Sequence, residues 1–224
     1  MLKSILISLI TLSSLVNFAN AGIISGNAIP SSLEVNSNPE SDTDIFLYAE
    51  RQNVMLGADL DVDFLAATGL SGSLLAGTTV NSFIFNYDAV GTDYSRGSFN
   101  ATGTHFFDTK ILAVIWTGSR PGAQPQTAKN LGKSDSVLGV AGVTYPTDFL
   151  GRGLELEADF YGANGTNDVF TVSGNQIDLS LFARAPYSDQ LRVITAAKVE
   201  VPEPAAIVLF GTALCLFGFR RFSK

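Results

Sequence analysis

The sequence predicts an all-β fold, an antiparallel β-sandwich that is jelly-roll-like in strand number, for the part of the chain between two apolar ends. Two observations support this. Short runs rich in β-branched and aromatic residues are separated by Gly, Asn, Asp, Pro and Ser. No sustained i, i+3, i+4 apolar spacing runs through the body of the chain. The expected strands are residues 45–49, 80–87, 97–102, 111–116, 153–158, 168–173, 176–183 and 191–195.

Three of these segments predict how their strands are covered or connected. Residues 111–116 are continuously apolar, which is typical of a central strand buried on both faces, whereas residues 154–157 alternate Leu and Glu like a strand with one wet face. Residues 169–172 and 177–181 are joined by Ser-Gly-Asn-Gln, and Gly and Asn supply the positive φ angles that tight turns require. We therefore expect a hairpin there.

One short segment is ambiguous between a helix and a loop. Residues 134–138 read Ser-Asp-Ser-Val-Leu, and Ser134 is a residue type that caps the first turn of a helix. The sequence is equally compatible with a helical turn that begins at Ser134 and with a loop.

The N-terminal segment has the three parts of a secretory signal peptide. Lys3 precedes an apolar run over residues 5–18, and the small residues Ala19 and Ala21 stand before Gly22. The run is too short for a comfortable membrane span. We expect residues 1–21 to be removed by signal peptidase, so that the exported chain starts at Gly22.

The C-terminal segment, residues 201–224, is a second targeting element. Pro202, Glu203 and Pro204 interrupt any regular structure, residues 205–219 carry no charge, and Arg220 and Arg221 follow. An apolar helix of that length reaches only about 22 Å, whereas the hydrocarbon core is about 30 Å thick, so it predicts a marginal and temporary anchor. The arginines place residues 22–200 on the outer side of the inner membrane.

This tail closely resembles the PEP-CTERM sorting signal of Gram-negative bacteria. The resemblance implies processing by an exosortase, with Pro202, Glu203 and Pro204 as the recognition element and Arg220 and Arg221 as the retention cluster. It also implies release to the cell surface and an association with exopolysaccharide and biofilm. A looser similarity of residues 110–115, 134–139, 142–146, 152–156 and 189–195 to the bodies of other, uncharacterised PEP-CTERM proteins supports one β-rich domain over residues 22–200 and brings no activity with it.

Charge and cysteine content exclude several classes of function. Without the four cations of the two ends, ten cations face 21 acidic residues, a net charge of −11. A domain of this charge repels phosphate backbones, so nucleic acid is excluded as a partner. Cys215 lies in the apolar tail segment, so residues 22–200 have neither a disulfide nor a thiolate for metal binding or catalysis.

No catalytic constellation is visible in the sequence. His105 is the sole histidine, and we expect it at a strand edge rather than in a catalytic site or a His-based zinc centre. Glu155 with Glu157 resembles an ordinary solvated face more than the carboxylate pair of a glycosidase. Asp59, Asp61 and Asp63 are weak candidates for calcium, because they offer hard oxygens without the Gly and distal Glu of an EF-hand loop.

Three classes of function stay open. The first is a non-catalytic surface or matrix protein, favoured because nothing reactive stands out. The second is a carbohydrate-binding module, in which aromatic residues stack on sugars; the candidates are Tyr87, Tyr94, Trp116 and Tyr161, although Trp116 lies in the most apolar strand and is expected in the core. The third, least favoured, is a carboxylate-dependent hydrolase.

Overall fold

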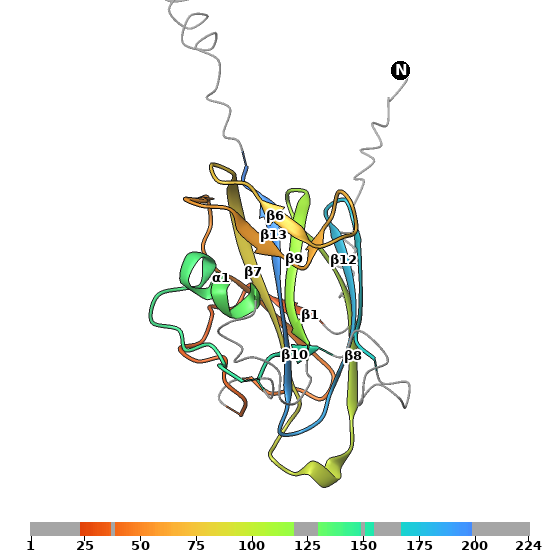
Figure 1. Ribbon diagram of the computed structural model, residues 1–224. Coiled ribbons are helices and arrows are strands. Elements are labelled where there is room, and N and C mark those ends of the chain that lie inside the picture. The colour runs from red at the N-terminus through yellow and green to blue at the C-terminus, as the bar shows by residue number, and fades with distance from the viewer. Residues whose placement is uncertain (1–22, 37–38, 119–129, 149–150, 155–166, 199–224) are drawn as a thin grey trace, which may run out of the picture.

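The computed structural model describes residues 23–36, 39–118, 130–148, 151–154 and 167–198, and these residues form an eight-stranded and a three-stranded β-sheet that pack together, a two-stranded sheet and one α-helix (Figure 1). The all-β class is therefore confirmed. The larger sheet has the strand order β1 (Ile23–Ser25), β2 (Ile45–Ala49), β7 (Thr79–Asp88), β13 (Ser188–Ala196), β9 (Ile111–Gly118) and β10 (Gly153–Leu154), with β3 (Val54–Met55) on β7 and β5 (Phe64–Leu65) on β9.

The three-stranded sheet covers one face of the larger, eight-stranded sheet. Its order is β11 (Val169–Ser173), β12 (Gln176–Ala183) and β8 (Phe99–Phe106), and a single 3-10 turn, η1 (Tyr94–Arg96), lies between β7 and β8. Ser173 pairs with Gln176, so the expected hairpin is confirmed, with Gly174 at φ 65° in its turn. The two sheets share one buried cluster, which includes Leu47, Phe85, Val114, Ala101, Leu179 and Leu181.

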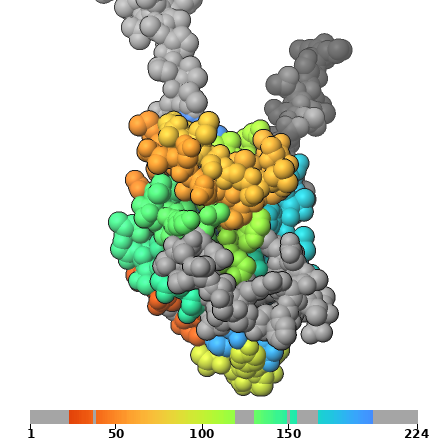
Figure 2. All heavy atoms as spheres, viewed as in Figure 1, coloured from red at the N-terminus to blue at the C-terminus, as the bar shows by residue number. Residues whose placement is uncertain are grey.

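The opposite face of the larger sheet is covered by α1 (Asn130–Leu138) and by the two-stranded sheet of β4 (Leu60–Val62) and β6 (Gly72–Leu74). Figure 2 shows these segments side by side on that face. Leu131 and Leu138 of α1 are buried in one cluster with Ala113 and Ile115 of β9. This double coverage explains the continuously apolar sequence of β9, because side chains on both faces of the strand avoid water.

Two expectations are corrected by the observed pairing and by α1. The larger sheet is not purely antiparallel, because β1 pairs with β2 and β10 pairs with β9 in parallel. The helix begins at Asn130, so Ser134 lies inside it rather than capping it. Its hydroxyl donates to the Leu131 carbonyl, the back-bond that a helical Ser makes when it is kept from water.

The open side of the two-sheet core is closed where β1 crosses β8. A Cβ atom placed on Gly103 of β8 would lie 2.5 Å from Cγ1 and 2.9 Å from Cδ1 of Ile23. Real Cβ atoms do not approach so closely, so a residue without a side chain is required for this contact. Ile23 in turn packs against the shared core.

The two segments that the sequence predicts to be targeting signals lie outside the described residues. This applies to Ala19, Ala21 and Gly22 of the predicted signal peptide, and to Pro202, Glu203, Pro204, Arg220 and Arg221 of the predicted sorting tail. Within the part of the chain that the structure describes, no helix has the length and apolarity needed to cross a membrane.

Candidate functional site

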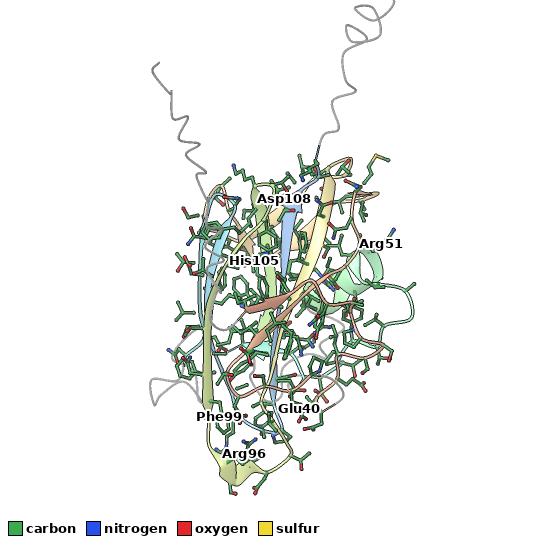
Figure 3. All side chains as sticks on the ribbon, turned by 180° about the vertical axis from the view of Figure 1, so that it is seen from behind. Glu40, Arg51, Arg96, Phe99, His105 and Asp108 are labelled. Carbon is green, nitrogen blue, oxygen red and sulfur yellow. The ribbon has the colours of Figure 1, made fainter. Side chains whose placement is uncertain are left out.

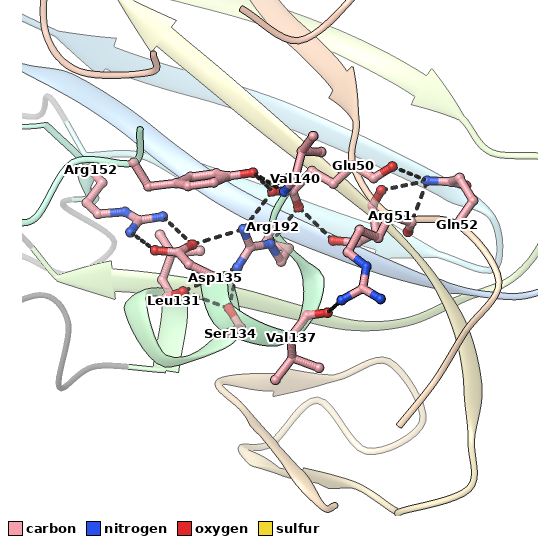
Figure 4. A network of polar contacts seen from close by, with 12 residues as sticks. Glu50, Arg51, Gln52, Leu131, Ser134, Asp135, Val137, Val140, Arg152 and Arg192 are labelled. Carbon is pink, nitrogen blue, oxygen red and sulfur yellow. Dashed lines mark hydrogen bonds and ion pairs between the residues drawn. The ribbon is translucent and has the colours of Figure 1, made fainter. Parts of the chain in front are cut away.

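A buried network of charged groups lies between α1 and the larger sheet (Figure 4). The guanidinium of Arg192, on β13, is completely buried and donates to both Glu50 carboxylate oxygens at 2.6 Å. It also donates to Asp135 of α1 at 3.0 Å. Arg152 binds the same Asp135 through two contacts of 2.7 and 3.2 Å. Two guanidiniums thus face two carboxylates, and their charges cancel.

Neutral groups complete the network. Ser82 donates to Glu50 at 2.6 Å, Tyr145 donates to Glu50 at 2.7 Å, and the Tyr145 hydroxyl accepts from the Val140 amide at 3.0 Å. Burial lowers the pKa of Arg192, but the carboxylates of Glu50 and Asp135 outweigh that effect and raise the pKa above its ordinary value. Burial, together with the Glu50 carboxylate, also raises the pKa of Tyr145. Arg192 is therefore held charged and Tyr145 neutral.

This network holds α1 on the sheet and does not resemble a reactive site. Arg192 also contacts the Leu131 carbonyl at 3.2 Å and the Ser134 hydroxyl, so one side chain of the sheet binds one turn of the helix. Arg51 binds the Val137 carbonyl at 2.7 Å near the helix C-terminus, where orphan carbonyls need partners. The groups of the network face one another rather than a cavity, so we assign the network to the stability of the fold.

Another buried carboxylate, Asp88, lies at the end of β7. Its Oδ2 accepts a hydrogen bond of 3.0 Å from the Asn36 amide, whereas its Oδ1 is buried without a partner among the described residues. Burial raises the pKa of Asp88 to about 7; the Asn36 amide opposes this shift, and the charge of Glu40 adds to it. A carboxylate with one unsatisfied buried oxygen is costly when ionised.

We expect Asp88→Asn to stabilise the protein at pH 8 by about 1–3 kcal/mol. The folded state binds the Asp88 proton more tightly than the unfolded state. The protonated carboxyl therefore adds to the stability of the fold below about pH 4, and this stabilisation is lost as the pH rises to about 7. Urea denaturation at pH 4.5 and pH 8 measures the difference, which should be small at the lower pH. Asp61→Asn, an exposed carboxylate on β4, is the control; a gain as large for Asp61→Asn would contradict the assignment.

An open groove of about 760 Å³ lies where β8 ends, beside the adjoining ends of β7 and β13. We name it the His105 groove. Figure 3 shows His105 and, closer to that end of the molecule, Asp108. The lining residues are Gln52, Asn53, Asn81, Phe83, His105, Phe106, Phe107, Asp108, Thr109, Thr195 and Lys198.

Three rings form the floor of the His105 groove. The Phe107 ring centroid lies 4.8 Å from that of Phe83 and 4.7 Å from that of His105. Phe107 is buried, whereas Phe83 and His105 are half-buried and present part of their rings to the groove. The imidazole of His105 makes no hydrogen bond to any described residue, and burial lowers its pKa. The neutral ring therefore keeps one donor and one acceptor nitrogen for a ligand.

The three calcium candidates do not converge. Asp59 accepts from the Ala76 amide and Asp61 from the Ser73 hydroxyl, whereas Asp63 binds the Trp116 amide and the Asn130 side chain. Among the described residues, no group of three or more His, Cys, Asp or Glu side chains is arranged to hold a metal ion. The carboxylates of the three aspartates instead form hydrogen bonds with neighbouring loops and strands.

The other residues singled out from the sequence are scattered. Tyr87 is fully buried, and Trp116 packs against the shared core, as expected. Tyr94 meets the Tyr187 ring edge-on and lies under the Arg184 guanidinium, at the far end from the His105 groove. Tyr161, Glu155 and Glu157 lie outside the described residues. Tyr87, Tyr94 and Trp116 therefore do not lie together as one aromatic platform for a sugar.

Sequence reasoning missed both the charge network and the groove. One usable signal was present for the network, since Arg192 stands between the apolar residues Leu191 and Val193, and a charged side chain in such a run requires a buried partner. The groove had no comparable signal, because its lining comes from four separate segments. Comparisons of the chain with family models, curated proteins and solved structures found no match.

Proposed function

We propose that the protein is exported across the inner membrane, held there transiently by residues 205–219 and released to the cell surface by an exosortase. Residues 22–200 then act outside the cell as a non-catalytic surface or matrix protein linked to exopolysaccharide or biofilm. The motif of Pro202, Glu203 and Pro204 with Arg220 and Arg221 carries this proposal. The jelly-roll-like description of the sandwich and the C-terminal apolar helix are parts of the same proposal.

The position of the last strand supports processing at the tail. β13 is a central strand, between β7 and β9, and it ends at Ala196, six residues before Pro202. A cut near Pro202 would therefore leave every strand of the core in place. The core also contains no disulfide, and its buried charge network is one device that stabilises it without one.

We expect the exported protein, analysed by mass spectrometry, to start at Gly22 and to lack every peptide beyond the Pro202 region. Replacing Pro202, Glu203 and Pro204 together by alanine should abolish this processing, because the recognition element is removed while the apolar segment is kept. The uncleaved variant should stay in the membrane fraction.

The matched control replaces Lys198 by alanine, a change just upstream that removes an exposed ion pair with Asp108 and leaves the Pro-Glu-Pro motif intact. Processing of this control should be normal. Surface material that retains Arg220 and Arg221 in the unaltered protein would contradict sorting by cleavage.

A further inference from the structure

We propose that the His105 groove binds a neutral saccharide chain. The size of the groove, about 760 Å³, falls within the range of about 300–1,000 Å³ that is common for small-ligand sites. It is open rather than enclosed, which suits a segment of a chain better than a trapped monomer. Three further properties of the lining specify the chemistry of the ligand.

The first property is the ring floor. Phe83 and His105 present half-buried rings on either side of the buried Phe107, and Phe106 at the rim is 58% exposed. Sugars carry apolar C–H faces, and aromatic rings bury such faces while the polar edge of the sugar stays wet. The groove therefore offers an apolar surface to one side of a sugar ring.

The second property is a set of polar atoms that the fold leaves unused. Both nitrogens of His105 lack a hydrogen-bond partner among the described residues, and so does the exposed side-chain amide of Asn53. The Nε2 of Gln52 donates to backbone carbonyls, including that of Ser82 at 2.8 Å, and these bonds fix the side chain at the groove wall. Neutral imidazole and amide groups each both donate and accept, as hydroxyl groups do.

The third property is the absence of net charge. Asp108 and Lys198 are the charged residues of the lining, and they pair with each other at 2.6 Å. An anionic ligand finds no unpaired cation in the lining, and a cationic ligand finds no unpaired carboxylate. A phosphate, a uronic acid polymer or a basic peptide would lose hydration there without gaining an opposite charge.

The biological meaning of such binding rests on the proposed export, which would bring the groove into contact with envelope glycans. The binding itself depends only on residues of the described domain. A protein that is never cleaved at its tail would still bind, and a cleaved protein whose groove is inert would not, so the two proposals fail separately.

The experiment titrates the purified full chain, in a detergent without a sugar headgroup, with cellohexaose, maltohexaose, xylohexaose and mannohexaose. Because the chain has one histidine, its imidazole Cε1–H gives a single NMR signal that reports on the groove. We expect at least one of the four to shift this signal in a saturable way and to give a matching isotherm by calorimetry.

Variants locate the binding. His105→Phe keeps the ring and removes the nitrogens, and Asn53→Ala removes an exposed amide; each should weaken binding about three- to tenfold, as the loss of one or two hydrogen bonds predicts. Thr102→Ala, on the exposed face of the same strand β8, is the matched control and should bind normally. Melting temperatures confirm that each variant is folded.

Several outcomes would overturn the proposal. The first is that none of the neutral oligosaccharides shifts the His105 signal or gives heat of binding. The second is that only polygalacturonate or inorganic phosphate binds. The third is that the unaltered protein and His105→Phe bind the oligosaccharide with equal affinity. Saturable binding that Thr102→Ala keeps and His105→Phe loses supports it.

Discussion

Replacing Glu50 by Gln should lower the free energy of unfolding by about 3–5 kcal/mol. The change keeps the shape of the side chain but leaves the guanidinium of Arg192, which is completely buried, without the carboxylate that it contacts twice at 2.6 Å. Removing one partner of a buried ion pair costs more than the pair contributes, because the other charge stays desolvated. Since typical domains are stable by about 5–15 kcal/mol, the loss is a large share of the total.

Two companion variants separate this effect from general sensitivity to mutation. Asp108→Asn removes one partner of an ion pair whose side chains are mostly exposed, and it should cost at most about 1 kcal/mol. The double change Glu50→Leu with Arg192→Met removes both charges and should recover much of the stability lost in Glu50→Gln. Denaturant unfolding measures all three, and hydrogen exchange should show α1 as the first element to open in Glu50→Gln. Equal costs for Glu50→Gln and Asp108→Asn would refute the assignment.

Replacing Gly103 by Ala should destabilise the protein by about 1–3 kcal/mol, the usual cost of overpacking. The added methyl group would overlap the Ile23 side chain where β1 closes the two-sheet core. Adding Ile23→Ala to Gly103→Ala should relieve the overlap, because the nearest clashing atoms belong to that side chain. A double-mutant cycle measures this coupling.

Gly118→Ala is the control for the loss of a strand glycine. A Cβ atom there would meet no atom within 4 Å, so its effect on stability should be small. Additive effects of Gly103→Ala and Ile23→Ala would show that β1 does not lie against β8 as described.

The strands could be predicted where residue type and the alternation of apolar and polar residues along the chain are enough to mark them. Residues 45–49 and 176–183 coincide with β2 and β12, and the hairpin turn at Gly174 followed from the residue types alone. The short strands β1, β3, β4, β5 and β6 were missed, because two or three residues carry too little periodicity to be recognised. Helix α1 was uncertain because its sequence has only a narrow apolar stripe, and Leu131 and Leu138 gain their stability from the sheet.

By itself, the sequence determined the all-β class, the acidic charge and the pattern of both chain ends, because each depends on composition or on neighbours along the chain. The tertiary structure alone decided that Glu50 meets Arg192, which is 142 residues away, that Asp59, Asp61 and Asp63 separate, and that His105 joins Phe83 and Phe107 in one groove. Such contacts depend on strand order and on which face each side chain takes. Strand order is set by the packing of whole sheets, which no local pattern encodes.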